Sequence, residues 1–349
     1  MTAEHEPRVL AFLDRIYAEP DRRFAFRGDD ATDVATWEQA ARPELRRLIG
    51  LEVIGRPPAD FEPSVTLSDA EDLGDYTRRR GVLNAEPDVA VPFWFLLPSS
   101  EGPHQLGLFP HGHYGRNGLD YAAGIAADER MRARIVREDR DVAVQAVRRG
   151  YAAIAPATRG FAPLDIPDIN KRHGERDCRS AFLHALLAGR TLTGERVWDL
   201  QRLLDWALRR PDIDPSGAFA VGNSAGGIVA IYAAACDGRI VAAVTSCCVC
   251  TFVGRSGAIH HCDCDAVPGI MGFGELHDVA GLIAPRPLLV VHGRTDPLFP
   301  PSEIDRAVTG LRHIYAAAGA SRALRHAWGD GGHRFYGDLM WPFLKQSLP

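Results

Sequence analysis

Short apolar runs alternate with amphipathic segments from about residue 80 to the end of the chain. The runs are VPFWFLL, QLGLFP, YAAIAP, AFAVG, IVAAVTSCCV, RPLLVVHG and LRHAW. Most of them are continuously apolar, which is typical of strands covered on both faces. Apolar residues at helical spacing mark the segments between the runs, at 141–150, 196–211, 224–235 and 302–318. The alternation predicts an α/β fold: a mostly parallel central sheet with helices on both faces.

The first 75 residues follow a different pattern. Helical apolar spacing covers 7–18 and 35–51, and charged, proline-containing connectors such as GRPPADFEP follow. We expect residues 1–75 to form a helical N-terminal extension packed on a main domain over 76–349. Within that domain, 160–195 is too long for a simple strand-to-helix connection and predicts a partly helical insertion.

Composition excludes several classes of partner. The chain has 349 residues, 46% hydrophobic and 24% charged, which is ordinary for a soluble globular protein. The net charge of −5 gives no reason to expect nucleic acid. No run approaches the roughly 18 apolar residues that span a membrane, and the N-terminus lacks the apolar core of a signal peptide. We therefore expect a cytoplasmic protein without membrane or nucleic-acid partners. The sequence does not determine its oligomeric state.

One glycine-rich stretch, VGNSAGG, carries the first sign of chemistry. The strand AFAV precedes Ser224 and a helix follows it. The spacing G-x-S-x-G suits a sharp strand-to-helix turn, in which a side chain at either glycine would collide with its neighbours. An ordinary glycine-rich turn is the alternative interpretation. With strand and helix in place, the pattern predicts that Ser224 is a nucleophile with a strained backbone.

A nucleophilic serine needs a base and an acid that orients the base. Asp296 follows the strand RPLLVVHG, and His333 lies in the glycine-rich loop after LRHAW. The order nucleophile, acid, base is that of α/β hydrolases, and we expect His333 to lie within hydrogen-bond reach of the serine. Asp263 and Asp265 are the alternative acids, on a loop over 253–280 that we expect to overhang the site.

The developing oxyanion of an acyl transfer needs hydrogen-bond donors. We expect one from the backbone N–H of Ala225, and the other from the N–H of His113 in the loop HGHYG. Four side chains are candidates for substrate contacts: His111, Tyr114, His261 and Trp328. For the side chains of His111 and His113, a structural role in the loop is the alternative.

These landmarks together resemble a known family. HGHYG, RGYAAIAPATRGFA, VWDLQRLLDWALRRPDID, VGNSAGG, APRPLLVVHGRTDPLFP and GGH are similar to the corresponding motifs of α/β-hydrolases of the dienelactone hydrolase/acetyl xylan esterase-like group, over roughly 80–345. The resemblance implies the same nucleophile Ser224, acid Asp296, base His333 and oxyanion donors, with no cofactor.

The chain departs from this family at ATRGF. Ala157 and Thr158 stand where relatives usually have an acidic residue before the arginine and glycine. The difference affects the packing of this loop, so we assign Arg159 no catalytic role.

The expected function is that of a serine hydrolase acting on small carboxylic esters through an acyl-enzyme. By the resemblance, short acyl groups such as acetyl on a sugar or a secondary metabolite suit it best. The alternatives are peptidase or lactonase action, or non-hydrolytic use of the same triad by an acyltransferase, lyase or cyclase. A purely binding role is disfavoured, because every triad position is filled.

A cysteine- and histidine-rich stretch follows the strand after the nucleophile helix. Cys247 and Cys250 have C-x-x-C spacing, and His260, His261, Cys262 and Cys264 come soon after, which permits a zinc site. Against this, Cys247 and Cys248 end an apolar run, where cysteine behaves as a small hydrophobe, and the C-x-C spacing is tight. We therefore predict no metal, and a role in bracing the loop or shaping the pocket.

Overall fold

A ten-stranded sheet runs through the part of the chain that the computed structural model describes, which is 6–17, 22–56, 58, 60–114, 118–167, 177–254 and 257–348. The strands are β1 Ser64–Leu67, β2 Glu71–Asp72, β3 Tyr76–Glu86, β4 Val89–Pro98, β5 His104–Leu108, β6 Ala152–Pro156, β7 Ile213–Asn223, β8 Ile240–Ser246, β9 Leu288–Gly293 and β10 Leu324–Gly329. Their order is β1-β3-β4-β6-β5-β7-β8-β9-β10, and β2 pairs with β3.

Most of this sheet is parallel. The strands β6, β5, β7, β8, β9 and β10 all pair in parallel, whereas β1, β2, β3 and β4 form an antiparallel edge that joins β6 through β4. All seven apolar runs contain a strand, β4 to β10, and the predicted fold class is confirmed. In parallel sheets the strand carboxyl ends meet at one edge, so the loops after β5, β7, β8, β9 and β10 converge there.

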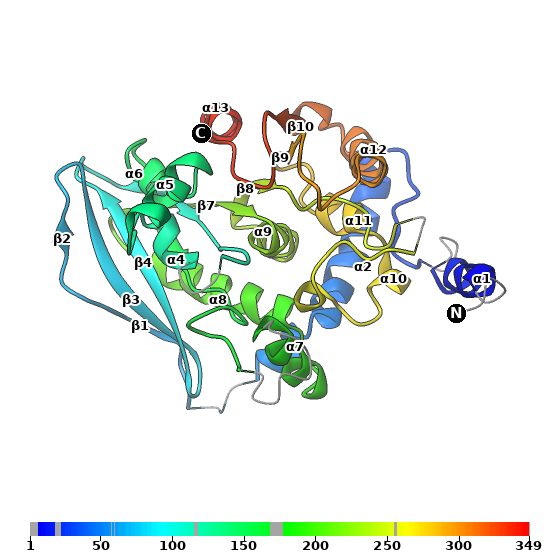
Figure 1. Ribbon diagram of the computed structural model, residues 1–349, viewed down its shortest axis with the longest axis horizontal. Coiled ribbons are helices and arrows are strands. Elements are labelled where there is room, and N and C mark those ends of the chain that lie inside the picture. Colours follow the sequence, from blue (N-terminus) through cyan, green and yellow to red (C-terminus); the bar gives the residue numbers. More distant parts are fainter. Residues whose placement is uncertain are drawn as a thin grey trace.

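The helices cover both faces of the sheet. They are α1 Glu6–Ile16, α2 Ala31–Leu48, α3 Leu51–Ile54, α4 Gly118–Ala122, α5 Glu129–Arg137, α6 Val142–Val147, α7 Asp177–Leu187, α8 Leu192–Ala207, α9 Ala225–Cys236, α10 Ile270–Phe273, α11 Leu276–Gly281, α12 Pro301–Ala317 and α13 Gly337–Ser347, with 3₁₀ turns η3 Asp263–Asp265 and η4 Ser321–Ala323. Figure 1 shows α9 near the centre of the molecule, with α11 and α12 to one side and α5 and α6 to the other.

Alternation within β7 separates two hydrophobic cores. Ala218 and Ala220 join the core built with α2, α8, α9, α11 and α12. Phe219 and Val221 join the core built with α4, α5, α6 and α13. Because both faces are covered, the strand reads as a continuous apolar run although its side chains still point alternately to the two sides.

The N-terminal segment contains the predicted helices, as α1 and α2. Asp30 caps α2 by accepting hydrogen bonds from the N–H groups of Thr32 and Asp33. From α2, Arg46 donates to the carbonyl of Cys236 at the end of α9 at 3.0 Å, where a cation suits the helix dipole. The expected helical extension over 1–75 also contains two strands, β1 and β2, which belong to the sheet. The division into domains stays a prediction.

Two long connecting segments of the chain, the insertion over 160–195 and the loop after β8, contain short helices. The predicted insertion over 160–195 contains α7, and residues 168–176 of it lie outside the described part. The loop between β8 and α11 contains η3 and α10, with a bridge between Val253 and Ile259. Among the described helices, none combines the length and the apolar character needed to cross a membrane.

Candidate active site

Ser224 occupies the sharp turn between β7 and α9. Its backbone has φ 59° and ψ −132°, a region that L-residues rarely adopt, so the predicted strain is confirmed. A Cβ at Gly222 would lie 2.0 Å from the carbonyl oxygen of Gly226, and one at Gly226 would lie 2.3 Å from that of Pro110. The two glycines therefore let the turn close against the loop after β5.

That loop lies directly against the serine. A Cβ at Gly112 would lie 2.8 Å from the carbonyl oxygen of Asn223 and 3.2 Å from the Cβ of Ser224. The amides of His113 and Ala225, the two predicted oxyanion donors, make no hydrogen bond to any other described residue, and both residues line the cavity that contains Ser224. Neither N–H group is therefore engaged within the described part of the chain.

His333 and Asp296 form a hydrogen-bonded pair. The His333 Nδ1 atom lies 2.7 Å from Asp296 Oδ2, and the amide of Leu298 donates to Asp296 Oδ1 at 3.0 Å. Burial alone would raise the pKa of Asp296, but the hydrogen bonds from His333 and Leu298 outweigh it and hold the pKa below its ordinary value. The carboxylate is therefore charged at neutral pH and fixes one ring nitrogen of the histidine.

The strand ends of β7 and β8 hold the loop that carries His333. Asn223 Nδ2 donates to the carbonyl of Arg334 at 3.2 Å and to that of Ser246 at 3.1 Å. Ser246 Oγ donates to the same Arg334 carbonyl at 2.7 Å, and Tyr336 donates its hydroxyl to Gly332 at 2.6 Å. Sequence reasoning did not identify Asn223, whose position beside the nucleophile is the only signal in the sequence.

The predicted hydrogen bond between Ser224 and His333 is not formed in this structure. Both residues line one cavity, but the described residues include no hydrogen bond between the two side chains. That His333 lies within hydrogen-bond reach of Ser224 stays a prediction. In unliganded sites such hydrogen bonds are often long and tighten only with substrate.

The cavity around the serine has a volume of about 600 Å³. Its lining mixes apolar side chains with charged ones, which come from α5, from the segment that follows it and from η3. The lining residues include His113, Tyr114, Arg134, Glu138, Arg140, Ser224, Ala225, Ile228, Ile259, His260, His261, Leu298, Phe299 and His333.

Two of the four candidate substrate contacts line this cavity, and two do not. Tyr114 and His261 line it; Tyr114 also donates its hydroxyl to Asn223. Trp328 is a correction, because its ring packs against His292 at 5.6 Å and against His326 at 5.3 Å on β10. Because side chains alternate along a strand, Trp328 lies on the same face of the sheet as His326.

His111 is the second correction, since it is buried beneath the loop. Its Nδ1 donates to the Gly112 carbonyl at 2.9 Å and its Nε2 accepts from the Thr158 amide at 3.1 Å. Burial lowers the pKa of His111 to about 4, and the nearby charge of Arg196 adds to this effect. The neutral ring joins the loops after β5 and β6, which is the structural alternative for this residue.

The alternative acids have partners elsewhere. Asp263 forms an ion pair with Arg179 at 3.0 Å, and Asp265 forms one with Arg196 at 2.7 Å. Neither carboxylate is hydrogen-bonded to His333, whose acid partner is Asp296.

The cysteine- and histidine-rich stretch divides into two groups. Cys247 lies under the acid–base pair, within 4.8 Å of Asp296 and His333. Cys262 and Cys264 lie apart from it, next to His113 and to Cys178 of α7. Sequence reasoning missed Cys178, because it stands far from the stretch in the chain and only the fold brings it there.

Arg159 belongs to a buried ionic network. Its guanidinium pairs with Asp199 at 2.6 Å and with Glu86 at 2.7 Å, and Arg190 also binds Glu86 at 2.7 Å. The network joins β3, the loop after β6 and α8. It does not line the cavity around Ser224.

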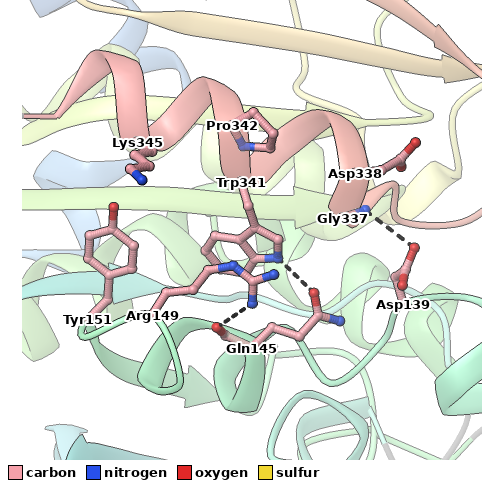
Figure 2. Close-up of a pocket in the computed structure, with 9 residues that line it drawn as sticks. All are labelled: Asp139, Gln145, Arg149, Tyr151, Gly337, Asp338, Trp341, Pro342 and Lys345. Atoms are coloured by element: carbon pink, nitrogen blue, oxygen red, sulfur yellow. Dashed lines mark hydrogen bonds between the residues drawn. The ribbon is translucent and has the colours of Figure 1, made fainter.

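A second pocket, of about 740 Å³, lies between α6 and α13. Figure 2 shows Trp341 of α13 at its centre, with Nε1 donating to Gln145 at 2.7 Å and Arg149 lying over the ring at 4.8 Å. The hydrogen bond of the Gly337 amide to Asp139, at 3.3 Å, closes one end. These contacts fasten α13 to α6, and none of the candidate catalytic residues lines this pocket.

No family model matches the chain. Over 299 residues it is 27% identical to "Putative hydrolase YtaP" of Bacillus subtilis (strain 168), which covers 84% of this chain and 92% of that protein. A putative acetyl xylan esterase from Bacteroides fragilis superposes with a TM-score of 0.73 at 17% identity, covering 98% of this chain and 84% of that one. A glucuronoyl esterase from Solibacter usitatus gives 0.67 at 16% identity, with 92% and 94% covered.

At sequence identities of 16–17% the superpositions establish similarity of fold and nothing further. The sheet order, the sharp turn after β7 and the positions of the loops after β9 and β10 agree with it. The chain has the α/β-hydrolase fold.

Proposed function

We propose that this chain is a serine hydrolase of small carboxylic esters. Ser224 is the nucleophile, His333 the base and Asp296 the acid that orients it. The observation that carries the proposal is the placement of a serine with φ 59° in one cavity with a histidine whose Nδ1 is 2.7 Å from a carboxylate. The names of the similar proteins, a hydrolase and two esterases, support the same reaction class.

The chemistry follows from the positions of these groups. Ser224 Oγ attacks the ester carbonyl carbon while His333 Nε2 accepts its proton, which requires the serine and the ring to move into contact. The negative charge on the former carbonyl oxygen is stabilised by the amides of His113 and Ala225. His333 then protonates the leaving alcohol, and a water molecule deprotonated by the same ring hydrolyses the acyl-enzyme.

The lining of the cavity supports a short acyl group on a polar alcohol. Ile228, Leu298 and Phe299 are apolar side chains available to the acyl chain. Glu138 and Arg140 offer charged groups, which suit the hydroxyl groups of a sugar or a similar polar metabolite. Acetyl esters of such alcohols are the substrate class that we propose.

A fluorophosphonate probe and a set of aryl esters test the proposal. The wild-type chain should gain one probe adduct on Ser224 and release free acid from aryl acetate faster than from the octanoate. Ser224→Ala should lose the adduct and the turnover, whereas Ser216→Ala, which changes an exposed serine on the same strand, should retain both.

Two results would count against the proposal. A wild-type chain that is folded but takes no adduct on Ser224 is not a serine hydrolase. Acyl transfer to an added alcohol without release of free acid in its absence would point to an acyltransferase instead.

A further inference from the structure

Four potential metal ligands meet beside the cavity, from three separate segments. The Nε2 atom of His113 and the Sγ atoms of Cys178, Cys262 and Cys264 all lie within 4.8 Å of one another. His113 comes from the loop after β5, Cys178 from α7, and the other two cysteines from η3 and its N-cap. One imidazole and three thiols form a donor set that is typical of structural zinc sites.

Three separations within the cluster agree with a tetrahedron of ligands around one ion, and all six are below 4.8 Å. His113 Nε2 lies 3.6 Å from Cys178 Sγ and 3.5 Å from Cys264 Sγ, and the Sγ atoms of Cys178 and Cys262 lie 3.9 Å apart. With Zn–S bonds of about 2.3 Å and Zn–N bonds of about 2.0–2.1 Å, tetrahedral geometry places S and N about 3.5 Å apart and two S atoms about 3.8 Å apart. The sulfur separation is also far longer than a disulfide bond of about 2.05 Å.

The surroundings suit a cluster of thiolates. Cys178 and Cys264 are buried, while Cys262 and His113 are partly or fully exposed and leave a path for an ion. Arg196 is fully buried beside the cluster, with Nη1 3.4 Å from the Cys264 carbonyl and 2.7 Å from Asp265. Its Nη2 has no hydrogen-bond partner in the described part of the chain. The Nη2 group of this guanidinium is the donor left over after the ion pair with Asp265, and it lies beside the cysteines.

We propose that His113, Cys178, Cys262 and Cys264 bind one structural zinc ion. Zinc is favoured over magnesium or calcium because thiolate and imidazole are soft ligands, and the tetrahedral arrangement agrees with it. Four protein ligands fill the coordination shell, so the ion has no open position for substrate or water. It fastens α7 to the loop after β5 and to η3, and the last two border the cavity. This proposal departs from the sequence-based prediction of no metal.

The site has a consequence for catalysis, which rests on the proposed function. His113 would use its side chain for the metal and its backbone N–H for the oxyanion. The ion would then fix the position of an oxyanion donor without touching the substrate. Loss of zinc should therefore lower kcat more than it changes KM.

Metal analysis of the full chain tests the site directly. After purification under reducing conditions and reconstitution with Zn²⁺, elemental analysis should give about one zinc ion per chain. Replacement by Co²⁺ should give the thiolate-to-cobalt charge-transfer absorption and the visible bands of a tetrahedral site. Less than about a tenth of an equivalent of zinc, or an octahedral cobalt spectrum, would overturn the proposal.

Variants identify the ligands. Cys178→Ala and Cys264→Ala should each lower the zinc content at least about tenfold, whereas Cys236→Ala, at a buried cysteine of α9 outside the cluster, should keep it. Zinc retained in both ligand variants would contradict the assignment. If a ligand variant does not fold, the cobalt spectrum of the wild-type chain still decides between the two outcomes.

The Ser224→Ala variant separates this proposal from the proposed function. Because it keeps all four ligands, it should bind zinc like the wild type although it has no nucleophile. A chain that binds zinc but forms no acyl-enzyme refutes the function and leaves the metal site standing. An active chain that binds no zinc refutes the metal site and leaves the proposed function standing.

Discussion

The ring of His333 is held by the carboxylate of Asp296, with 2.7 Å between Nδ1 and Oδ2. The two residues come from the loops after neighbouring strands, β10 and β9. Those loops are joined by backbone hydrogen bonds, from Arg294 to Gly329 at 3.0 Å and from Thr295 to Gly331 at 2.9 Å. Acid and base are thus fixed with respect to each other by the sheet edge itself.

This pairing predicts the effect of removing the acid's charge. Asp296→Asn should lower kcat roughly 10³–10⁴-fold, because the amide favours the wrong tautomer of the histidine. Steady-state hydrolysis of an aryl acetate measures the loss. Asp330→Asn, at an exposed aspartate in the adjacent loop, is the matched control and should stay near the wild-type rate. Equal losses in both variants would remove Asp296 from the mechanism.

The close approach of Gly112 to the serine predicts a second effect. The Cβ of Gly112→Ala would push the loop away from the Asn223 carbonyl, 2.8 Å away, and displace the His113 amide. We expect kcat to fall by roughly 10²–10³, as for the loss of one oxyanion donor, with a smaller change in KM. Gly238→Ala, where a Cβ meets open space, should be neutral. Unchanged kcat in the Gly112 variant would show that the loop supplies no donor.

Buried His111 predicts a pH dependence of stability. Its pKa is lowered to about 4 in the folded state, against about 6.5 in the unfolded chain. The unfolded state therefore binds more protons between these values, and the contribution of His111 is complete above pH 6.5 and is lost as the pH falls toward 4. The positive charge of Arg196 acts in the same direction. Between pH 7 and pH 5 the loss is about 2 kcal/mol.

Urea unfolding at a series of pH values measures this contribution. In His111→Gln the free energy of unfolding should fall less steeply between pH 7 and pH 5 than in the wild type. His313→Gln, at an exposed histidine of α12, serves as the control. Identical slopes for His111→Gln and the wild type would mean that the ring is not held neutral.

The network around Arg159 predicts a loss of stability without a change in chemistry. Arg159→Met leaves Asp199 buried without its partner, and the free energy of unfolding should fall by roughly 3–5 kcal/mol. The double variant Arg159→Met with Asp199→Leu should recover most of it, because both charges are gone. Denaturant unfolding measures both. A catalytic role would appear instead as lost kcat in the folded double variant.

The sequence predicts the centre of the fold better than its edge. The runs that contain β5 to β9 are apolar because these strands are almost entirely buried, and their pattern is readable. The strand β3, YTRRRGVLNAE, carries three arginines, and β1 is only partly buried. Edge strands need no continuous apolar run. The strands β1 and β3 therefore pair through the hairpin of β3 with β4, and their sequences carry no comparable pattern.

For the site, order along the chain located Ser224, Asp296 and His333 in one region, because each follows a strand at the same sheet edge. Side-chain direction was harder to predict. Trp328 ends a strand at that edge, but the period of two along β10 puts it on the same face as His326. The position of Cys178 depends on how α7 folds back over η3, a contact between distant segments that no local pattern encodes.

The joined loops after β9 and β10 divide the proposed catalytic residues into two rigid groups. One group is the proposed nucleophile, held by the tight β7–α9 turn; the other is the proposed base, already hydrogen-bonded to its carboxylate. Assembly of a working centre is then a single alignment of Ser224 with the far nitrogen of His333, rather than the ordering of three separate groups. An inhibitor that bridges these two atoms would capture the aligned arrangement without any rearrangement of the acid.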